Sequence, residues 1–327
     1  MLTKRKFWAT DMSCQIGVRF YEPEKVPFVA KIMIAHDLGE NGSKYEKFAE
    51  YMNSKRIVVV IMDLPGHGES VNARGKPMYW YKGQWDKIVS DFMTLNFMLG
   101  EMYPELPCIM MGVGFGTWIV RDCLTREFKD CNRVDGTILV SPSNYSRFKS
   151  KMYLRYIDRL LKKTEDAEIS EYFTQKIFNY GNKLLPKNKE KSDYAWLFDE
   201  EEARKAYVED ESVYKFVTFG MAREIFQAMY DLRSNETFAS TNCEVPMFVV
   251  YGRYDPLITS STGDTSQDLE EEFGFHKGKK DKRTNLIVYP FYSSRAVMYT
   301  SDTSLLYRMI LYFVDSYAKY ERNYQRE

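Results

Sequence analysis

The sequence predicts an α/β fold, in which a mostly parallel central sheet carries helices on both faces and a helical segment is inserted. Two observations support this fold. Short apolar runs alternate with segments whose apolar positions recur at helical spacing, which is typical of parallel strands joined by crossover helices. The alternation stops near Asn144, and strands of comparable strength resume only after about residue 246.

In the first part of the chain, strands and helices alternate. Residues 7–9 and 15–21 are expected to form an antiparallel hairpin at the sheet edge. Short, fully apolar runs predict buried central strands at residues 29–35, 57–62, 108–111 and 136–140. Helices are predicted at residues 45–52 and 85–99, and from the end of the third buried strand to about residue 127. In the clearest helix the apolar positions share one face: Trp85, Ile88, Val89, Phe92, Leu95 and Leu99.

The second part of the chain begins with a long helical region. Residues 145–235 contain no strong strand, so we predict a helical insertion between two core segments, 1–144 and 236–327. The second core segment contains expected strands at 247–251 and 286–289, a helix near 268–273, a basic surface segment at 277–283 and a closing amphipathic helix at 304–317.

Composition excludes several classes of protein. Of the 327 residues, 44% are hydrophobic and 28% charged, as in ordinary globular proteins. The 46 basic and 46 acidic residues balance, so nothing global indicates nucleic acid or an anionic membrane. No apolar run reaches the roughly 18 residues that span a bilayer, and no signal-peptide pattern is present. Five scattered cysteines and three histidines indicate neither a disulfide framework nor a zinc site. We therefore expect a cytoplasmic protein without a metal or cofactor.

The stretch from Cys108 to Thr117 has a chemical meaning as well. It reads Cys-Ile-Met-Met-Gly-Val-Gly-Phe-Gly-Thr, an apolar strand that runs through three alternating glycines into a helix. This is the form of a nucleophile elbow, a sharp strand-to-helix turn that normally reads Gly-x-Ser-x-Gly. Gly112 and Gly116 stand at the flanking glycine positions, whereas Gly114 stands where the serine is expected.

Several further motifs occur in a fixed order along the chain. They are His36-Asp37-Leu38-Gly39-Glu40, the run Asp-Leu-Pro-Gly-His-Gly-Glu-Ser at 63–70, Ser141-Pro142, Trp196-Leu197 with the acidic residues 199–211, Tyr254-Asp255-Pro256 and the segment 286–294. With these motifs and the elbow, nearly the whole chain resembles the α/β-hydrolase superfamily. Within it, the chain resembles the bacterial lysophospholipase and monoacylglycerol lipase-like branch of the serine aminopeptidase S33 type.

This resemblance implies a site in which a serine attacks an ester, a histidine takes its proton and an acid orients the histidine. Asp255 matches the acid, Gly114 stands at the nucleophile position and Ser294 at the histidine position. The backbone N–H groups of Leu38 and Phe115 match the oxyanion hole. Asp37 replaces a glycine of the family's loop, and an inward carboxylate there would oppose a developing oxyanion.

No other residue of the sequence replaces the missing groups convincingly. His36 and His67 lie in loops whose family counterparts are mainly structural, and His276 lies in a lysine-rich segment. Cys123 is expected in the core. Ser141, Ser293 and Ser294 have no histidine partner in the pattern.

Two local consequences follow from the substitutions. The elbow residue normally has a positive φ, which glycine adopts freely, so Gly114→Ser is expected to lower the melting temperature. Asp255 has lost its imidazole partner; either Arg295 turns inward to pair with it, or Asp255 is solvated at a strand end or caps the next turn.

Aromatic residues are frequent around the predicted cap and its approach. They are Tyr79, Trp80, Tyr81, Tyr145, Phe148, Tyr153, Tyr156, Phe173, Tyr180, Phe216, Phe219 and Phe226. Two interpretations stay open: packing between cap helices, or a retained pocket for a lipid-like or other apolar ligand.

Three functions therefore compete. The first is a catalytically degenerate hydrolase that binds an apolar ligand or a partner. The second is an active carboxylic-ester hydrolase with a non-standard site, and the third is a scaffold that forms a homodimer through its cap. The sequence favours the first.

Overall fold

The computed structural model describes residues 1–70, 75–126, 134–143, 146–185, 187, 192–234, 237, 241–242, 244–259, 286–300 and 303–324 of the chain, with side chains described to residue 316. The predicted helix at 268–273, the basic segment at 277–283 and His276 lie outside these residues.

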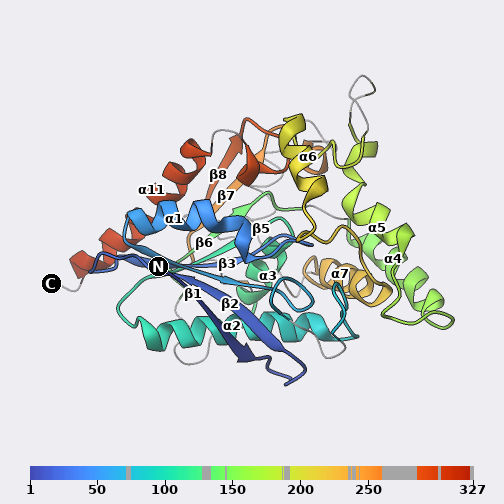
Figure 1. Ribbon diagram of the computed structural model, residues 1–327, viewed down its shortest axis with the longest axis horizontal. Coiled ribbons are helices and arrows are strands. Elements are labelled where there is room, and N and C mark those ends of the chain that lie inside the picture. Colours follow the sequence, from blue (N-terminus) through green and yellow to red (C-terminus); the bar gives the residue numbers. More distant parts are fainter. Residues whose placement is uncertain are drawn as a thin grey trace.

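One eight-stranded sheet forms the centre of the protein (Figure 1). Its strands, in spatial order, are β1 (Leu2–Trp8), β2 (Gln15–Tyr21), β4 (Ile57–Met62), β3 (Ala30–Ala35), β5 (Cys108–Val113), β6 (Gly136–Val140), β7 (Met247–Gly252) and β8 (Leu286–Phe291). The pairs β1–β2 and β2–β4 are antiparallel, and all other neighbours are parallel. This confirms the predicted mostly parallel sheet with an antiparallel hairpin at its edge.

Each face of the sheet is covered by its own apolar core. On β3, Ile32 and Ile34 enter one core, whereas Met33 and Ala35 enter the other, because successive side chains of a strand point to opposite faces. Helices α1 (Glu46–Ser54) and α11 (Ser304–Tyr324) cover the first face. Helices α2 (Gln84–Met102) and α3 (Gly116–Cys123) cover the second face (Figure 1). Burial on both faces explains why the central strands are continuous apolar runs.

Residues 146–234, here called the helical segment, contain α4 (Arg147–Leu160), α5 (Glu171–Phe178), η2 (Gly181–Lys183), α6 (Glu201–Glu209) and α7 (Phe219–Asp231). The side chains of Ser146, Ser170 and Thr218 accept hydrogen bonds from backbone N–H groups in the first turns of α4, α5 and α7. Within the described part of the segment, the only β-type pairing is an isolated bridge, so its helical character is confirmed.

The helical segment lies at the end of the sheet where the parallel strands finish (Figure 1). The Tyr214 N–H donates to the carbonyl of Gly39, which follows β3, at 2.8 Å. The Ala296 N–H, which follows β8, donates to the carbonyl of Leu197 at 2.8 Å. The segment therefore covers the loops at the carboxyl ends of the strands. Its boundaries as a separate domain remain a prediction.

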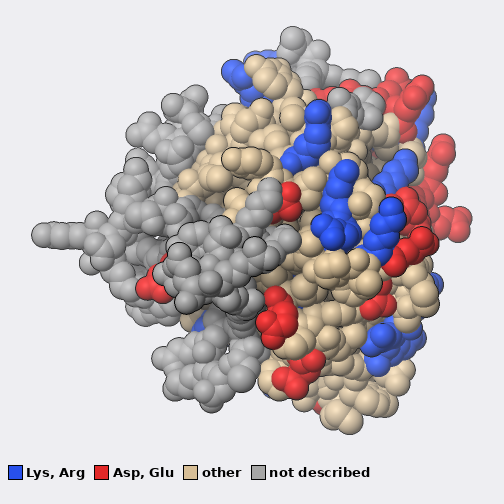
Figure 2. Space-filling model, turned by 90° about the vertical axis from the view of Figure 1, so that its left-hand side faces the viewer, with Lys and Arg blue, Asp and Glu red and all other residues tan. Residues whose placement is uncertain are grey.

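Three short helices complete the described elements: η1 (Gly42–Tyr45), α9 (Pro256–Thr259) and η3 (Val297–Tyr299). The largest differences from prediction are at the chain ends, where β1 begins at Leu2 rather than at Phe7 and α11 extends to Tyr324 rather than ending at residue 317. Helix α3 ends at Cys123, earlier than the expected residue 127. No helix in the described ranges is long and apolar enough to cross a membrane. Figure 2 shows basic and acidic side chains interspersed on one face, in line with their balanced numbers.

Candidate active site

The residues singled out in the sequence converge at one edge of the sheet. Asp37 follows β3, Gly114 follows β5, Ser143 follows β6, Asp255 follows β7 and Arg295 follows β8. These five strands are parallel to their neighbours in the sheet, so their carboxyl ends meet at this edge. In open α/β sheets this edge is where ligand sites form.

The turn between β5 and α3 depends on its glycines. Gly114 has φ +52°, a left-handed conformation, so the predicted positive φ is confirmed. Its N–H donates to the carbonyl of Val140 at 2.9 Å, and its carbonyl accepts from the Thr117 hydroxyl at 2.6 Å. A Cβ on Gly116 would lie 2.0 Å from the carbonyl oxygen of Ala35. The start of α3 can therefore approach β3 closely only because this residue has no side chain.

Asp37 fills the space beside Gly114. A Cβ built on Gly114 would lie 2.1 Å from both Cγ and Oδ2 of Asp37. Oδ1 of Asp37 accepts hydrogen bonds from the Phe115 N–H at 2.6 Å and from the Leu38 N–H at 2.8 Å. The two N–H groups that the sequence suggests as an oxyanion hole thus converge on one point, and the protein's own carboxylate occupies it.

Arg295 is buried between two side chains of neighbouring loops. Its Nη1 lies 2.9 Å from Oδ2 of Asp255, which is 0% exposed, and its Nη2 donates to the hydroxyl of Ser143 at 2.6 Å. The guanidinium also lies over the Trp196 ring, 5.6 Å from its centroid. The predicted Arg295–Asp255 pair is confirmed. Asp255 is buried rather than solvated, and its Oδ1 also accepts the Leu257 N–H at 2.9 Å, so it caps the next turn as well.

Charge links these groups into one network. Burial raises the pKa of Asp255, and the positive charge of Arg295 opposes that rise. Burial likewise raises the pKa of Asp37, which Arg295 and the N–H groups of Phe115 and Leu38 oppose. Asp37 also raises the pKa of Asp255. One buried guanidinium therefore compensates two carboxyl groups, so a change at one of the three alters the other two.

Ser294, at the expected histidine position, contacts the helical segment instead of Asp255. Its hydroxyl donates to Oδ1 of Asp199 at 2.6 Å, and its backbone N–H donates to Oδ2 of the same carboxylate. Sequence reasoning did not find Asp199, nor the contacts of Ser143 and Trp196. Asp199 was visible only as one residue of an acidic stretch, so its partner had no sequence signal.

A comparison with known protein families shows which family this chain belongs to. The family described as serine aminopeptidase, S33, matches residues 27–289, which is most of the chain. The chain belongs to this family.

Two relatives with known names match over a shorter part of the family fold. A monoglyceride lipase homolog of Monkeypox virus is 28% identical over 127 residues, covering 39% of this chain and 43% of the relative. The monoglyceride lipase of Rattus norvegicus is 25% identical over 124 residues, 38% of each chain. The chain therefore matches less than half of the length of both relatives.

Solved structures match over nearly the whole chain. A carboxyl esterase from Bacillus coagulans has a TM-score of 0.80 at 18% identity, covering 97% of this chain and 99% of the esterase. A monoglyceride lipase variant from Saccharomyces cerevisiae has a TM-score of 0.67 at 14% identity, covering 97% and 95%. At these identities the likeness shows the α/β-hydrolase fold.

Both described histidines of this S33-family chain have structural roles. Nδ1 of His36 donates to the Asp37 carbonyl at 2.7 Å, and its Nε2 accepts the Leu64 N–H at 2.9 Å. His67 makes equivalent contacts with the Pro65 carbonyl at 3.1 Å and the Gly39 N–H at 3.0 Å. Burial lowers the pKa of His36 to about 4 and that of His67 to about 3. Both rings stay neutral at pH 7 and hold the loops after β3 and β4.

Cys123 is also excluded as a nucleophile by its surroundings. It is fully buried, and burial raises the pKa of its thiol far above the usual value. Within the described ranges, no group of three or more His, Cys, Asp or Glu side chains could hold a metal ion.

Two small cavities adjoin the network, and both are lined by Asp37, Leu197, Tyr207 and Arg295. The larger has about 60 Å³ of space for water-sized molecules, enough for a few waters. Its remaining wall is mostly apolar and includes Phe115, Phe178, Trp196, Ile225 and Met229.

Of the two interpretations of the aromatic residues, packing between helices describes the members of the set that pack in the helical segment. None of the described members of the aromatic set predicted from sequence lines either cavity. Tyr153, Phe173 and Phe226 instead pack against one another between α4, α5 and α7, with the Tyr153 and Phe226 ring centroids 4.7 Å apart. Phe148 and Tyr156 face outward. Tyr145 lies outside the described residues.

Proposed function

We propose that this chain is a catalytically degenerate α/β-hydrolase of the monoglyceride lipase and esterase type, which binds an apolar ligand or a partner without cleaving an ester. Gly114 stands at the nucleophile position, Ser294 at the histidine position and Asp255 at the acid position. Leu38 and Phe115 supply the former oxyanion-hole N–H groups. The observation that carries this proposal is the position of the Asp37 carboxylate beside Gly114.

Hydrolysis of an ester by this fold needs free space at the elbow and free N–H donors for the developing oxyanion. The Asp37 carboxylate removes both the free space and the free N–H donors. Its Oδ1 already receives both N–H groups, and its negative charge would repel a second anionic oxygen at the same point. The carboxylate acts as a permanent internal substitute for the oxyanion. Arg295 completes the substitution, because its guanidinium satisfies Asp255 where an imidazole would otherwise stand.

The ligand part of the proposal rests on the larger cavity. Its apolar wall and its polar end, formed by Asp37, Ser143 and Arg295, suit an amphiphile with a small hydrogen-bonding head. The names of two relatives, both monoglyceride lipases or their homologues, point to the same class of molecule. Because the cavity has only about 60 Å³, a lipid-sized ligand requires the side chains of α5 and α7 to move apart.

The first test is hydrolysis of short- and medium-chain p-nitrophenyl esters by the purified protein. We expect no rate above buffer. The variant Gly114→Ser/Ser294→His should also be inactive, because Asp37 still fills the elbow and Arg295 still holds Asp255. Wild-type hydrolysis well above the buffer rate, lost in Asp37→Asn, would overturn the proposal.

The ligand is tested by titrating the protein with monoglycerides and following tryptophan fluorescence, because Trp118 and Trp196 line the cavity. A saturable change that is reduced in Trp196→Phe supports binding there. Ile225→Phe, which places a larger side chain in the cavity wall without adding a tryptophan, should abolish it. A titration that leaves the fluorescence unchanged would contradict binding of this ligand class.

A further inference from the structure

Strand β1 is the outermost strand of the sheet. It stands first in the strand order, and among the described residues the only strand that pairs with it is β2 (Figure 1). The pairing continues without a bulge or a proline over seven residues, from Leu2 opposite Tyr21 to Trp8 opposite Gln15. Bulges and prolines are common on edge strands, because a regular edge is a template on which another chain can pair.

Two hydrogen bonds show which backbone groups of β1 face outward. The Ala9 N–H donates to the Cys14 carbonyl at 2.9 Å, and the Glu22 N–H donates to the Met1 carbonyl at 2.9 Å. In an antiparallel pair, residues bonded to the partner strand alternate with residues whose N–H and C=O groups point away from it. Because Met1 and Ala9 bond to the β2 side, the even-numbered residues 2–8 turn their backbone groups toward the outer edge.

The side chains of these four residues share one face of the sheet, because they alternate along the strand. They are Leu2, Lys4, Lys6 and Trp8, and all four are exposed, Leu2 by 40% and Trp8 by 53%. The outer edge of β1 therefore carries two lysines at its centre and a large apolar side chain at each end.

The lysines of the edge are only partly neutralised. Nζ of Lys4 lies 2.6 Å from Oε1 of Glu69, and Nη2 of Arg19, opposite Lys4 on β2, lies 3.3 Å from the same oxygen. The hydrogen bond from Lys4, and the charges of Lys4, Arg19 and Lys6, lower the pKa of Glu69. Within this group one carboxylate meets three basic side chains, so a positive charge remains at the edge.

We propose that the outer edge of β1 binds an extended acidic segment of another protein as an added antiparallel strand. The backbone of the segment bonds to the outward N–H and C=O groups of residues 2, 4, 6 and 8. Two acidic side chains at alternate positions lie opposite Lys4 and Lys6, and an apolar side chain two residues further on at each end contacts Leu2 or Trp8. The partner therefore has the pattern apolar-x-acidic-x-acidic-x-apolar. This inference does not depend on the proposed function.

Charge argues against a second copy of this chain at the same edge. If two β1 strands paired antiparallel about a two-fold axis, Lys4 of one copy would lie opposite Lys6 of the other. Like charges directly opposite each other destabilise a strand pair, whereas opposite charges stabilise it. An acidic segment converts both lysine positions into favourable pairs.

The test is fluorescence anisotropy of a dye-labelled peptide, Val-Thr-Glu-Thr-Glu-Thr-Val, titrated with the full chain. We expect saturable binding, and a Kd at least about tenfold weaker when both glutamates of the peptide are replaced by lysine. A third peptide carries N-methyl groups on the two glutamate amides. It keeps the charge but cannot donate these main-chain hydrogen bonds, so it should bind at least about tenfold more weakly as well. This peptide separates strand addition from plain attraction of charge.

Two variants of the protein test the edge itself. Lys6→Glu should weaken binding of the glutamate peptide and strengthen binding of the lysine peptide, each by about fivefold. Trp8→Ser should weaken binding of both peptides, because it removes the apolar contact at one end. Both side chains are exposed, so the melting temperature should not change. Lys162→Glu, which reverses an exposed charge just after α4, is the matched control and should bind like the wild type.

The proposal would be overturned if the glutamate peptide does not bind, if the N-methylated peptide binds equally well, or if Lys162→Glu weakens binding as much as Lys6→Glu. Sedimentation velocity tests the other occupant. A wild-type dimer that becomes tighter in Lys6→Glu, without binding of the peptide, would also overturn the proposal in favour of a second copy.

Discussion

At Gly114 two independent constraints act on a single residue. The backbone is left-handed, with φ +52°, and the Asp37 carboxylate lies where a side chain would begin. A serine at the elbow would meet both constraints at once. The absence of a side chain at residue 114 and the carboxylate of Asp37 are therefore compatible with each other, whereas a side chain at residue 114 would meet both the left-handed backbone and the carboxylate.

We predict that Gly114→Ser destabilises the protein by more than the roughly 1–3 kcal/mol of backbone strain, because the carboxylate must also move. Gly75→Ser is the matched control, since Gly75 has φ +63° but no atom within 4 Å of a built Cβ. Gly114→Ser/Asp37→Gly should recover part of the loss. Thermal and urea unfolding measure all three, and an unchanged melting temperature for Gly114→Ser would contradict the prediction.

Arg295 is the second residue on which the site depends. Removing one partner of a buried ion pair costs about 3–5 kcal/mol, so Arg295→Met should destabilise strongly. Burial already holds the folded-state pKa of Asp255 above 3.8, so this group's contribution to stability falls as pH rises from there through the folded pKa. Without Arg295 that pKa rises further. The loss in Arg295→Met should therefore be larger at about pH 8 than at about pH 5.

Urea unfolding at the two pH values measures this dependence. In Asp255→Asn/Arg295→Met the extra loss at high pH should shrink, because the asparagine does not ionise. The remaining difference between the two pH values should come from Asp37, whose charged form Arg295 also stabilises. Equal losses for Arg295→Met at both pH values would show that the guanidinium does not compensate these carboxyl groups.

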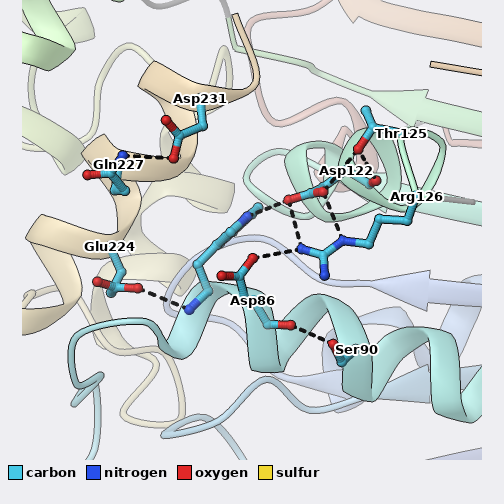
Figure 3. A network of polar contacts seen from close by, with 9 residues as sticks. Asp86, Ser90, Asp122, Thr125, Arg126, Glu224, Gln227 and Asp231 are labelled. Carbon is cyan, nitrogen blue, oxygen red and sulfur yellow. Dashed lines mark hydrogen bonds and ion pairs between the residues drawn. The ribbon is translucent and has the colours of Figure 1, made fainter. Parts of the chain in front are cut away.

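Among the helices, α2, α3 and α7 are joined by a buried polar network (Figure 3). The residue before α2 is Gly83, which has no side chain to cap the helix. Glu224 of α7 caps α2 instead, because its Oε2 accepts a hydrogen bond from the Trp85 N–H at 3.1 Å. The indole N–H of Trp85 then donates to Oδ2 of Asp122 on α3 at 2.6 Å. One residue near the start of α2 thus connects the sheet-covering helices with the helical segment.

We predict that Glu224→Leu lowers the unfolding free energy by about 1.5–3 kcal/mol, the usual loss for a hydrogen bond to a charged group. Glu224→Gln should lose less, because the amide oxygen still accepts the Trp85 N–H. Asp86→Asn is the comparison, since Asp86 meets Arg126 at 3.0 Å but is 72% exposed; its loss should stay below about 1 kcal/mol. Similar losses for Glu224→Leu and Asp86→Asn would refute a capping role for Glu224.

The whole molecule holds together through both faces of one sheet and through contacts between the sheet loops and the helical segment. Ser294 with Asp199, Tyr214 with Gly39, and Ala296 with Leu197 are such contacts. We predict one cooperative unfolding transition, in which tryptophan fluorescence and far-ultraviolet circular dichroism coincide. Trp196 reports on the segment, whereas Trp85 and Trp118 report on the helices beside the sheet. An earlier fluorescence change would show that the segment unfolds independently.

The central strands could be predicted because their burial on both faces gives each a continuous apolar run. Strand β1 could not be delimited in this way. Its residues Lys4, Arg5 and Lys6 are polar and mostly exposed at the sheet edge, and their strand conformation comes from pairing with β2. The spatial order of the strands likewise depends on pairing between distant segments, which local patterns do not record.

The sequence by itself determined the fold class, the elbow and the absence of serine at residue 114, because these depend on residue type and local spacing. Only the tertiary structure determined which groups the side chains of the site contact. Asp37 reaches the N–H of Phe115, 78 residues away, and Asp199 meets Ser294, 95 residues away. A buried charged group pairs with whichever group the folded chain places next to it. These neighbours are determined only when distant loops meet at the carboxyl edge of the sheet.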